Sequence, residues 1–323
     1  DFNPGRDFDR LNPGEQATTT IGYQISDGNG GLDYKTINVT VNGADETYVS
    51  NTQSINAITL ADGDVNHNGI EDWREPIATV PTGAGLAPSA FFGEVQQELS
   101  AVNTIRVVFS PGMIADAPSF NEFKAWVSAA ASAGYNVHLV YADGVSVSNT
   151  TIADTRMSAS AITQMHNSWQ SVLDWVNATP AVLNKIWGYE LLNEPEVYRT
   201  IVAGGHYVSG QDAVNYTNDM VNLFNGVTGW SDKKIIVGGL SASSNFTALD
   251  DAVMSTVDQR APIDVFHDTF GTRLVWSAHS YSGWYVQNEN VADWVQSWKD
   301  QFYPIAGDQI LLTETHARNP FVN

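Results

Sequence analysis

The sequence predicts an α/β protein in which a (β/α)8 TIM barrel follows a small β-unit. From about residue 77 onward, amphipathic helical segments alternate with short apolar runs. This alternation is typical of βα units whose strands form a parallel sheet buried on both faces. About six such strands over roughly 240 residues favour a barrel over a doubly wound sheet. No Gly-x-Gly-x-x-Gly turn follows a strand, which argues further against a dinucleotide-binding sheet.

The length and composition agree with more than one domain. The 323 residues are 43% hydrophobic and 11% aromatic, which is enough for one large core and a smaller unit. We expect a partial β-unit at 1–46, a linker with a calcium loop at 47–76, and the barrel at 77–323.

The first unit contains a predicted β-hairpin. Residues 21–26 and 35–41 alternate apolar and polar side chains, and a glycine-rich turn at 27–31 separates them. The pattern resembles the end of a cadherin-like repeat of the VCBS type, found in large bacterial surface proteins. The alternative is a hairpin linker without a function of its own.

The linker carries a candidate calcium loop at 64–75. Oxygen-bearing residues occupy its positions one, three, five, nine and twelve, and Gly69 allows the sharp turn at position six. The predicted ligands are Asp64, Asn66, Asn68, the backbone oxygen of Ile70, Asp72 and Glu75. The loop resembles those of thrombospondin type 3 and dockerin modules, although asparagine at two ligand positions should weaken binding. A structural Ca²⁺ would stiffen the joint with the barrel; an exposed acidic turn is the alternative.

The barrel elements follow from the periodicity of the apolar residues. The predicted helices cover residues 90–102, 120–133, 158–176, 211–224 and 288–302. The predicted strands cover residues 104–109, 135–141, 234–239, 274–281 and 310–316, and one more ends at Glu194. Only nine residues follow Glu314, so we expect the eighth βα unit to be absent, either because the chain is a fragment or because a neighbouring segment closes the barrel.

Two of these strands end in a glutamate, Glu194 and Glu314, 120 positions apart. Side chains at the carboxyl ends of barrel strands meet at one mouth, where active sites are built. Two carboxylates at such a mouth are the groups required for glycoside hydrolysis. The alternative for each glutamate is a partnership with a helix N-terminus or half of a salt bridge.

The order of the polar residues resembles a known family. Arg106 ends an early strand, Asn193-Glu194-Pro195 ends the fourth, His279 and Tyr281 lie two apart on the sixth, and a glutamate ends the seventh. This order resembles the retaining glycoside hydrolases of clan A, most nearly the family 5 type that includes cellulases and mannanases. The resemblance covers about residues 77–323.

The resemblance implies a role for each residue of the pattern. Glu194 would be the general acid/base, Glu314 the nucleophile, and Asn193 would bind the sugar 2-hydroxyl. No cofactor is required for this catalysis.

Other residues would support that pair. Arg106 and Tyr281 would keep the nucleophile ionised, and His279 would line the subsite beside the acid/base. His138 is a further substrate-binding candidate, with filling the barrel interior as the alternative. Glu190 shares a strand face with the acid/base, so we expect it to point into the barrel and pair with Arg106 or another donor.

Aromatic residues near strand ends suggest a polysaccharide substrate, because flat rings stack on sugar rings. The candidates are Trp276 and Trp284, with Trp187, Tyr207 and Tyr285. Four further tryptophans lie at helical spacings and are predicted to pack between helices and barrel: Trp169, Trp175, Trp294 and Trp298.

Charge and composition exclude some partners. A net charge of −21 argues against nucleic acids and anionic membranes, and no apolar run is long enough to span a bilayer. The absence of cysteine leaves the redox compartment open. The resemblances of the appended modules imply an extracellular or bacterial cell-surface protein with further domains.

Two function classes remain from the sequence. One is a secreted or surface-attached retaining endo-β-glycanase. The other is a calcium-stiffened surface adhesin or filament whose barrel binds glycans without hydrolysing them. The distance between the two carboxyl groups distinguishes them, because retaining catalysis needs about 5 to 5.5 Å.

Overall fold

A computed structural model describes residues 14–26, 31–42, 55, 57–60, 87–142, 156–202, 205–281, 296 and 299–316. The chain divides into two compact units, Asp1–Thr52 and Gln53–Asn323. Among the described residues, no helix is long and apolar enough to cross a membrane.

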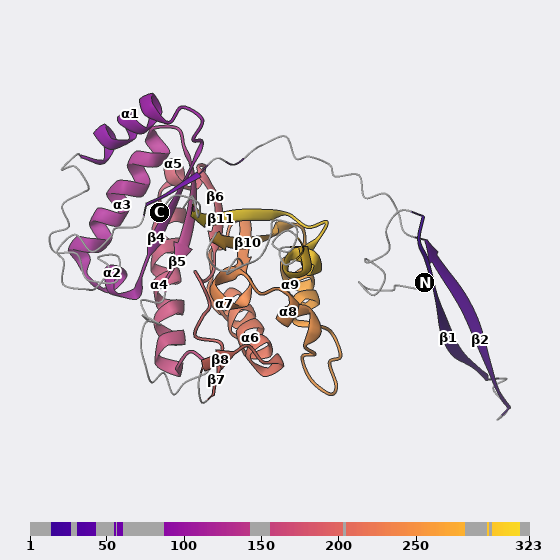
Figure 1. The fold of residues 1–323 in the computed structure, drawn as a ribbon. Helices are drawn as coiled ribbons and strands as arrows, with labels where there is room; N and C mark the ends of the chain where they lie inside the picture. The colour runs from indigo at the N-terminus through magenta and orange to yellow at the C-terminus, as the bar shows by residue number, and fades with distance from the viewer. Residues whose placement is uncertain are drawn as a thin grey trace. The chain divides into compact units, whose positions relative to one another are not determined.

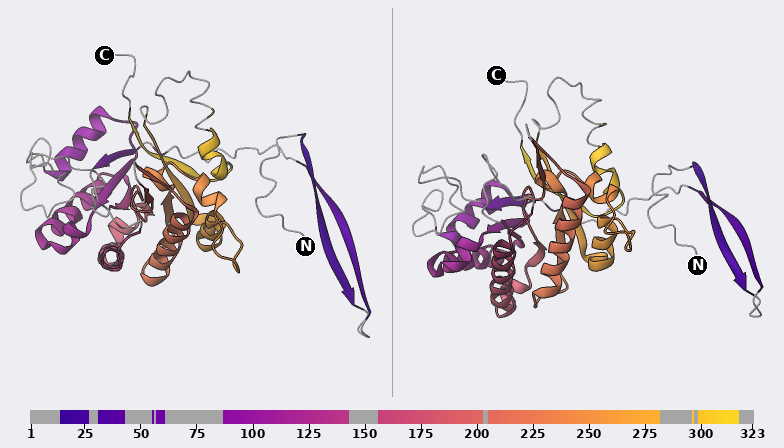
Figure 2. Two further views of the ribbon diagram at one scale, coloured as in Figure 1. Left: turned by 60° about the horizontal axis from the view of Figure 1, so that its bottom comes forward. Right: turned by 90° about the horizontal axis from the view of Figure 1, so that it is seen from below.

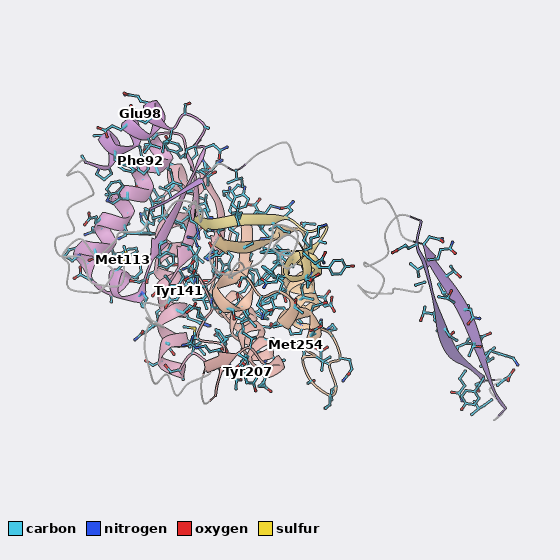
Figure 3. All side chains as sticks on the ribbon, viewed as in Figure 1. Phe92, Glu98, Met113, Tyr141, Tyr207 and Met254 are labelled. Atoms are coloured by element: carbon cyan, nitrogen blue, oxygen red, sulfur yellow. The ribbon has the colours of Figure 1, made fainter. Side chains whose placement is uncertain are left out.

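The first unit is a two-stranded antiparallel sheet. β1 (Gln16–Ser26) pairs with β2 (Leu32–Asn42) in continuous register from Gln16 opposite Asn42 to Ser26 opposite Leu32. The predicted hairpin is therefore confirmed. Its described side chains project on both sides of the ribbon, and all of them are exposed or half-buried (Figure 3). The cadherin-like repeat stays a prediction.

The second unit is built on a curled parallel sheet (Figures 1 and 2). Its strand order is β11-β10-β9-β6-β5-β4-β3, with β3 and β11 at the two edges of the described sheet. The strands are β3 (Ala57–Leu60), β4 (Thr104–Phe109), β5 (Asn136–Tyr141), β6 (Ile186–Glu190), β9 (Lys234–Gly238), β10 (Leu274–Tyr281) and β11 (Ile310–His316). The predicted α/β class is confirmed, and the curled parallel sheet is that of an open TIM barrel.

One strand of this sheet was not predicted. β3 pairs in parallel with β4, from Ala57 beside Thr104 to Leu60 beside Val107. It lies inside the range 47–76, which the sequence analysis assigned to the linker. The division between the compact units falls between Thr52 and Gln53, upstream of β3. The candidate calcium loop at 64–75 therefore follows a strand of the sheet in the chain, although the loop itself lies outside the described residues.

Helices cover one face of the sheet (Figures 1 and 2). They are α1 (Pro88–Glu98), α2 (Pro111–Ala115), α3 (Ala117–Ser132), α4 (Ala159–Asn177), α5 (Pro180–Leu183), α6 (Gly210–Gly226), α7 (Leu240–Ser243), α8 (Thr247–Asp251) and α9 (Pro262–Phe270), with 3₁₀ turns η2 (Gly271–Arg273) and η3 (Tyr303–Ile305). A small hairpin of β7 (Thr200–Val202) and β8 (Gly205–Tyr207) precedes α6. The four predicted helices up to residue 224 are confirmed to within a few residues. Only part of the fifth, 288–302, is described.

First-turn prolines and N-cap side chains define where several helices begin. Proline occupies the first turn of α1, α2, α3 and α9, where its missing N–H is not needed. The side chains of Ser110, Asp116 and Ser158 accept bonds from backbone N–H groups in the first turns of α2, α3 and α4. Ser209 and Asp212 form a reciprocal capping box on α6.

The two faces of the sheet have different chemistry. On β4, Ile105, Val107 and Phe109 face the helices and belong to the main apolar core. Arg106 and Val108 alternate with them on the inner face, and all six residues of the strand are buried. Burial on both faces explains why the strand has no simple polar and apolar alternation.

Candidate active site

Five polar side chains lie buried on the inner face of the sheet. They come from the three adjacent strands β4, β5 and β6 and from β10, which β9 separates from β6: Arg106 on β4, His138 on β5, Glu190 on β6, and Ser277 and His279 on β10. Each is at most 1% exposed. Because ionisable groups are costly to bury without partners, their contacts decide whether this set is stable.

Glu190 is the centre of the set. Arg106 Nε donates to Glu190 Oε2 at 2.9 Å, and Ser277 Oγ donates to Oε1 at 2.7 Å. His138 Nε2 lies 3.0 Å from Oε2 but is not oriented for a hydrogen bond. Burial alone would raise the pKa of Glu190, but the positive charge of Arg106 outweighs it and holds the pKa well below its ordinary value. The predicted inward direction and pairing of Glu190 are confirmed.

His138 and Arg106 therefore have structural partners. Burial lowers the pKa of His138, although Glu190 acts in the opposite direction. The lowered pKa favours a neutral ring. Arg106 also donates from its terminal nitrogen to Asn193 Oδ1 at 2.7 Å. It thus links the Glu190 carboxylate to the residue that precedes Glu194. The predicted action of Arg106 on Glu314 stays a prediction, because the side chain of Glu314 lies outside the described residues.

Glu194 lies beyond β6, which ends at Glu190, so the predicted strand end at Glu194 is wrong by four residues. Its carboxylate is about one-third exposed, and Oε1 lies 3.0 Å from Nδ1 of the buried His279. Its backbone φ of 42° is unusual for a residue other than glycine. A left-handed conformation costs about 1–3 kcal/mol, so the surrounding contacts must maintain it.

The backbone of β11 brings position 314 to the same site. Glu314 is the register partner of His279 on β10. The register shifts between Ala278 and His279, so that Thr313 is an extra residue on β11. Thr313 Oγ1 lies 2.6 Å from Ser277 Oγ and donates to the Ala278 carbonyl oxygen at 3.3 Å. His279 thus contacts Glu194 and lies beside position 314. The side chain of Glu314 lies outside the described residues, so the structure gives no distance between the two carboxyl groups.

The position of Trp276 differs from the one expected from the sequence. We expected its ring to bind substrate, but it is fully buried on the helix-facing side of β10. It packs against Phe246 and Phe266, with ring centroids 5.7 and 5.9 Å apart, and its Nε1 donates to Asp308 Oδ2 at 2.8 Å. Because alternate residues of a strand face opposite sides, Trp276 cannot share the inner face of His279.

The other aromatic residues singled out in the sequence lie in several places. Trp187 is half-buried near the start of β6, with its ring 6.1 Å from that of His138, at the opposite end of the strand from Glu194. Tyr207 is exposed on β8. Trp169 is confirmed as a core residue, and Trp175 is partly buried against the core. The side chain of Tyr281 and residues Trp284, Tyr285, Trp294 and Trp298 lie outside the described part of the chain.

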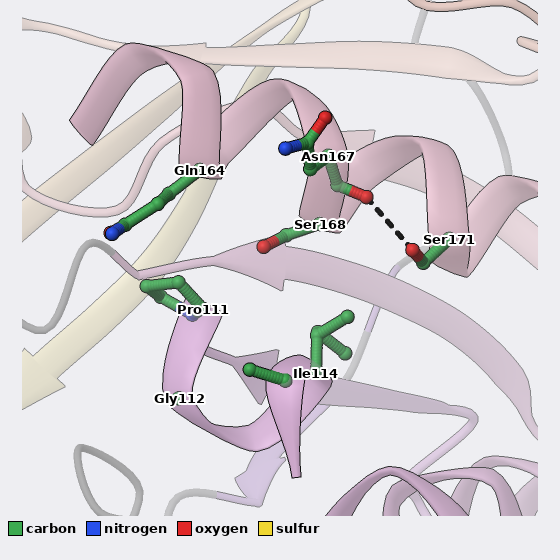
Figure 4. A pocket seen from close by; sticks show the side chains of 8 residues that line it. Pro111, Gly112, Ile114, Gln164, Asn167, Ser168 and Ser171 are labelled. Atoms are coloured by element: carbon green, nitrogen blue, oxygen red, sulfur yellow. Dashed lines mark hydrogen bonds between the residues drawn. The ribbon is translucent and has the colours of Figure 1, made fainter. Parts of the chain in front are cut away.

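A separate pocket of about 430 Å³ lies between α2 and α4 (Figure 4). Its lining residues are Pro111, Gly112, Ile114, Ala115, Gln164, Asn167, Ser168 and Ser171. None of these side chains is ionisable near neutral pH, so the pocket has no group for acid–base chemistry.

Two hydroxyl groups of the site were not predicted from the sequence. Ser277 and Thr313 connect Glu190 to β11 through Oγ contacts. Ser277 lies two residues before His279, and residues two apart on a strand share a face. That spacing would have found Ser277; the register shift that brings in Thr313 leaves no such signal in the sequence.

The sequence pattern of the Cellulase family (glycosyl hydrolase family 5) matches residues 94–319, which is more than half of the chain. The chain belongs to glycosyl hydrolase family 5. The family 5 match covers β4 to β11 and includes every inner-face residue described above. The second unit is therefore a glycoside hydrolase domain that acts on polysaccharide.

Solved structures agree with this fold. An endocellulase from Pyrococcus horikoshii in complex with cellotetraose has a TM-score of 0.52 at 13% identity, covering 77% of this chain and 75% of the other. A glycoside hydrolase 5 lichenase from Caldicellulosiruptor sp. F32, also with cellotetraose, has a TM-score of 0.50 at 12% identity, covering 81% and 75%. No curated protein matches the chain. At these identities the structural likeness concerns the fold.

Proposed function

We propose that the family 5 domain is a retaining endo-β-glycanase, with Glu194 as the general acid/base and Glu314 as the nucleophile. The main support is the position of His279, which contacts the Glu194 carboxylate and is the register partner of Glu314. A carboxylate in contact with this histidine and a second glutamate at the neighbouring register position suit a reaction in which one protonates the leaving oxygen and the other attacks the sugar.

Glu190 is the nearest competitor for the acid role, and its surroundings argue against it. It is fully buried, and both of its oxygens already have partners. Its lowered pKa keeps it ionised, so it has no proton to donate near neutral pH. Glu194 is partly exposed and can exchange protons with water and substrate. We assign Glu190 the role of fixing Arg106 and, through Arg106, the Asn193 amide.

In the proposed reaction, Glu194 protonates the glycosidic oxygen while Glu314 forms a covalent bond to the sugar. Glu194 then removes a proton from water, which releases the sugar with its original configuration. Asn193, whose Oδ1 accepts a bond from Arg106, is positioned to donate from its Nδ2 to the sugar 2-hydroxyl. We further propose that the protein acts outside the cell and that Ca²⁺ binds the loop at 64–75.

Product analysis tests the proposal. The protein should hydrolyse at least one member of a panel of β-1,4 and β-1,3 glucans, mannans and xylans, and the β-anomer should appear first by proton NMR. Glu194→Ala and Glu314→Gln should each lower turnover by roughly 10³-fold or more without unfolding the protein. Azide should restore turnover of an activated aryl glycoside in the Glu194→Ala variant, because it needs no general base.

Glu196→Gln is the matched control, since it removes a carboxylate two residues away in the same bend. It should keep near-parental activity. Full activity of either proposed catalytic variant, or first appearance of the α-anomer, would overturn the assignment. Glycan binding without hydrolysis by the parent protein would support the adhesin alternative.

A further inference from the structure

The left-handed backbone at Glu194 is restrained on its upstream side by the sheet. The Leu191 N–H donates to the Ile236 carbonyl oxygen at 3.0 Å, and the Asn193 N–H donates to that of Tyr141 at 2.7 Å. The indole of the buried Trp169 donates to the Leu191 carbonyl oxygen at 3.1 Å. The segment that leads to residue 194 is therefore held in place by β5, β9 and α4.

The chain after Glu194 is restrained by Tyr198. The Tyr198 N–H donates to the Pro195 carbonyl oxygen at 3.2 Å, which closes a turn directly after Glu194. The Tyr198 ring is fully buried, and its hydroxyl donates to Asp219 Oδ2 on α6 at 2.9 Å. This side chain thus ties the turn to a helix behind the sheet.

Asp219 is itself a buried charge with a dedicated partner. It is 2% exposed, and the Arg156 guanidinium contacts both of its oxygens, with Nε donating to Oδ2 at 2.9 Å. Burial and the charge of Asp219 raise the pKa of Tyr198 well above its ordinary value, so the hydroxyl remains a donor at any working pH. Arg156 precedes α4, Tyr198 follows β6 and Asp219 lies on α6, so three successive segments meet here.

We propose that Tyr198, Asp219 and Arg156 form a positioning network that holds the Glu194 carboxylate against His279. The inference rests on the proposed role of Glu194 and adds residues that do not touch the sugar. Without the Tyr198 anchor, residue 194 can relax toward a commoner backbone conformation, which would move its carboxylate away from the glycosidic oxygen. Misplacement of a catalytic group by about 1 Å costs on the order of 10²-fold in rate.

The test compares two buried tyrosines. Tyr198→Phe removes only the hydroxyl that bonds to Asp219. Tyr189→Phe is the matched control, because its ring is equally buried and its hydroxyl lies 3.0 Å from Ser231 Oγ, before the start of β9. Arg156→Gln is a second variant whose side chain is 45% exposed, so it weakens the network without opening the core.

We expect Tyr198→Phe to lower kcat on the polysaccharide by roughly 10-fold to 100-fold, with KM within about twofold of the parent. Arg156→Gln should have a smaller effect in the same direction, and Tyr189→Phe should have none. On an activated aryl glycoside with azide, which bypasses both roles of Glu194, the Tyr198→Phe loss should shrink to less than about threefold. Equal losses on both substrates, or equal losses in Tyr198→Phe and Tyr189→Phe, would overturn the network.

A crystal structure of each variant separates this inference from the proposed function. The network predicts that φ at residue 194 moves away from 42° in Tyr198→Phe and stays there in Tyr189→Phe. If the parent hydrolyses none of the glycans, the proposed function fails and the backbone comparison still decides the network. An unchanged residue 194 in Tyr198→Phe would reject it.

Discussion

The hairpin of β1 and β2 and the parallel sheet of the second unit differ in what their strands bury. Every described side chain of the hairpin is exposed or half-buried, including Tyr34, which is 71% exposed. In β4 every residue is buried. The hairpin also holds an exposed ion pair, Lys35 with Asp33, where the sheet holds the buried pair of Arg106 and Glu190.

The difference shows that one kind of contact has different consequences in the two units. An exposed pair gains little because water screens it, whereas removal of one partner from a buried pair leaves an uncompensated charge. The second unit should therefore depend strongly on its polar contacts, and the hairpin should not. All ten tryptophans lie beyond residue 52, so tryptophan fluorescence reports unfolding of the second unit alone.

The largest effect is expected from breaking the buried pair. Glu190→Gln should lower the free energy of unfolding of the second unit by about 3 kcal/mol at pH 7, because Arg106 loses its buried carboxylate. Asp33→Asn, which breaks the exposed pair of the hairpin, should leave the fluorescence-detected transition unchanged. Urea unfolding followed by tryptophan fluorescence measures the second unit in both variants, so Asp33→Asn is the control for a charge change outside that unit. A loss in Glu190→Gln no larger than in Asp33→Asn would show that the buried pair does not stabilise the second unit.

The same variant has a defined pH dependence. The pKa of Glu190 in the folded state lies below its unfolded value of about 4.5, so its ionisation stabilises the fold above that pH. This contribution is lost as pH falls from about 4.5 toward the lower folded pKa. The stability advantage of the parent over Glu190→Gln should therefore shrink between pH 5 and pH 3, as about 1.4 kcal/mol per pKa unit implies. A difference independent of pH would contradict the lowered pKa.

An intermediate effect is expected from removing one aromatic hydrogen bond in each unit. Trp276→Phe loses the bond to Asp308 and part of a buried ring, which should cost about 1–2 kcal/mol of unfolding free energy. Tyr34→Phe loses the bond from Gln24 Nε2 in the exposed hairpin and should not change the transition of the second unit. KM on the polysaccharide should be unchanged in Trp276→Phe. A raised KM with unchanged stability would restore the substrate-binding role that burial argues against.

The smallest effect concerns calcium and tests which unit the loop at 64–75 belongs to. Because this loop follows β3 in the chain, chelation should lower the fluorescence-detected melting temperature of the second unit by a few degrees. Asp64→Ala should melt at the chelated temperature and be insensitive to chelator at matched ionic strength. An unchanged melt of the parent would identify the loop as an ordinary turn.

Most of the fold was predictable because strands buried on both faces leave continuous apolar runs. The predicted ranges 104–109, 274–281 and 310–316 coincide with β4, β10 and β11. β3 was missed because four residues are too few to show a period, and an acidic stretch follows them. A continuous apolar run does not show which side of the strand faces the helices, so Trp276 was expected to bind substrate although it packs in the core.

The site was predictable in its residues more than in its contacts. The inward direction of Glu190 followed from its spacing to Glu194, and the pairing with Arg106 is confirmed. The bond from Arg106 to Asn193 was not predicted, because partner choice depends on the spacing of β4 and β6 across β5. The anchoring of the Glu194 bend by Tyr198 and Asp219 joins residues 21 positions apart and has no local sequence signal.

The extra residue at Thr313 changes which positions of β11 share a face of the sheet, and the sequence does not show this change. Before it, Leu311 pairs with Ser277; after it, Glu314 pairs with His279, so odd and even positions exchange faces within the strand. An alignment that counts residues evenly from Ile310 would pair Glu314 with Ser280 instead of His279. An insertion or deletion of one residue between Leu312 and Glu314 therefore changes the register of everything after it, and a relative that lacks one residue here would bring a different residue beside His279.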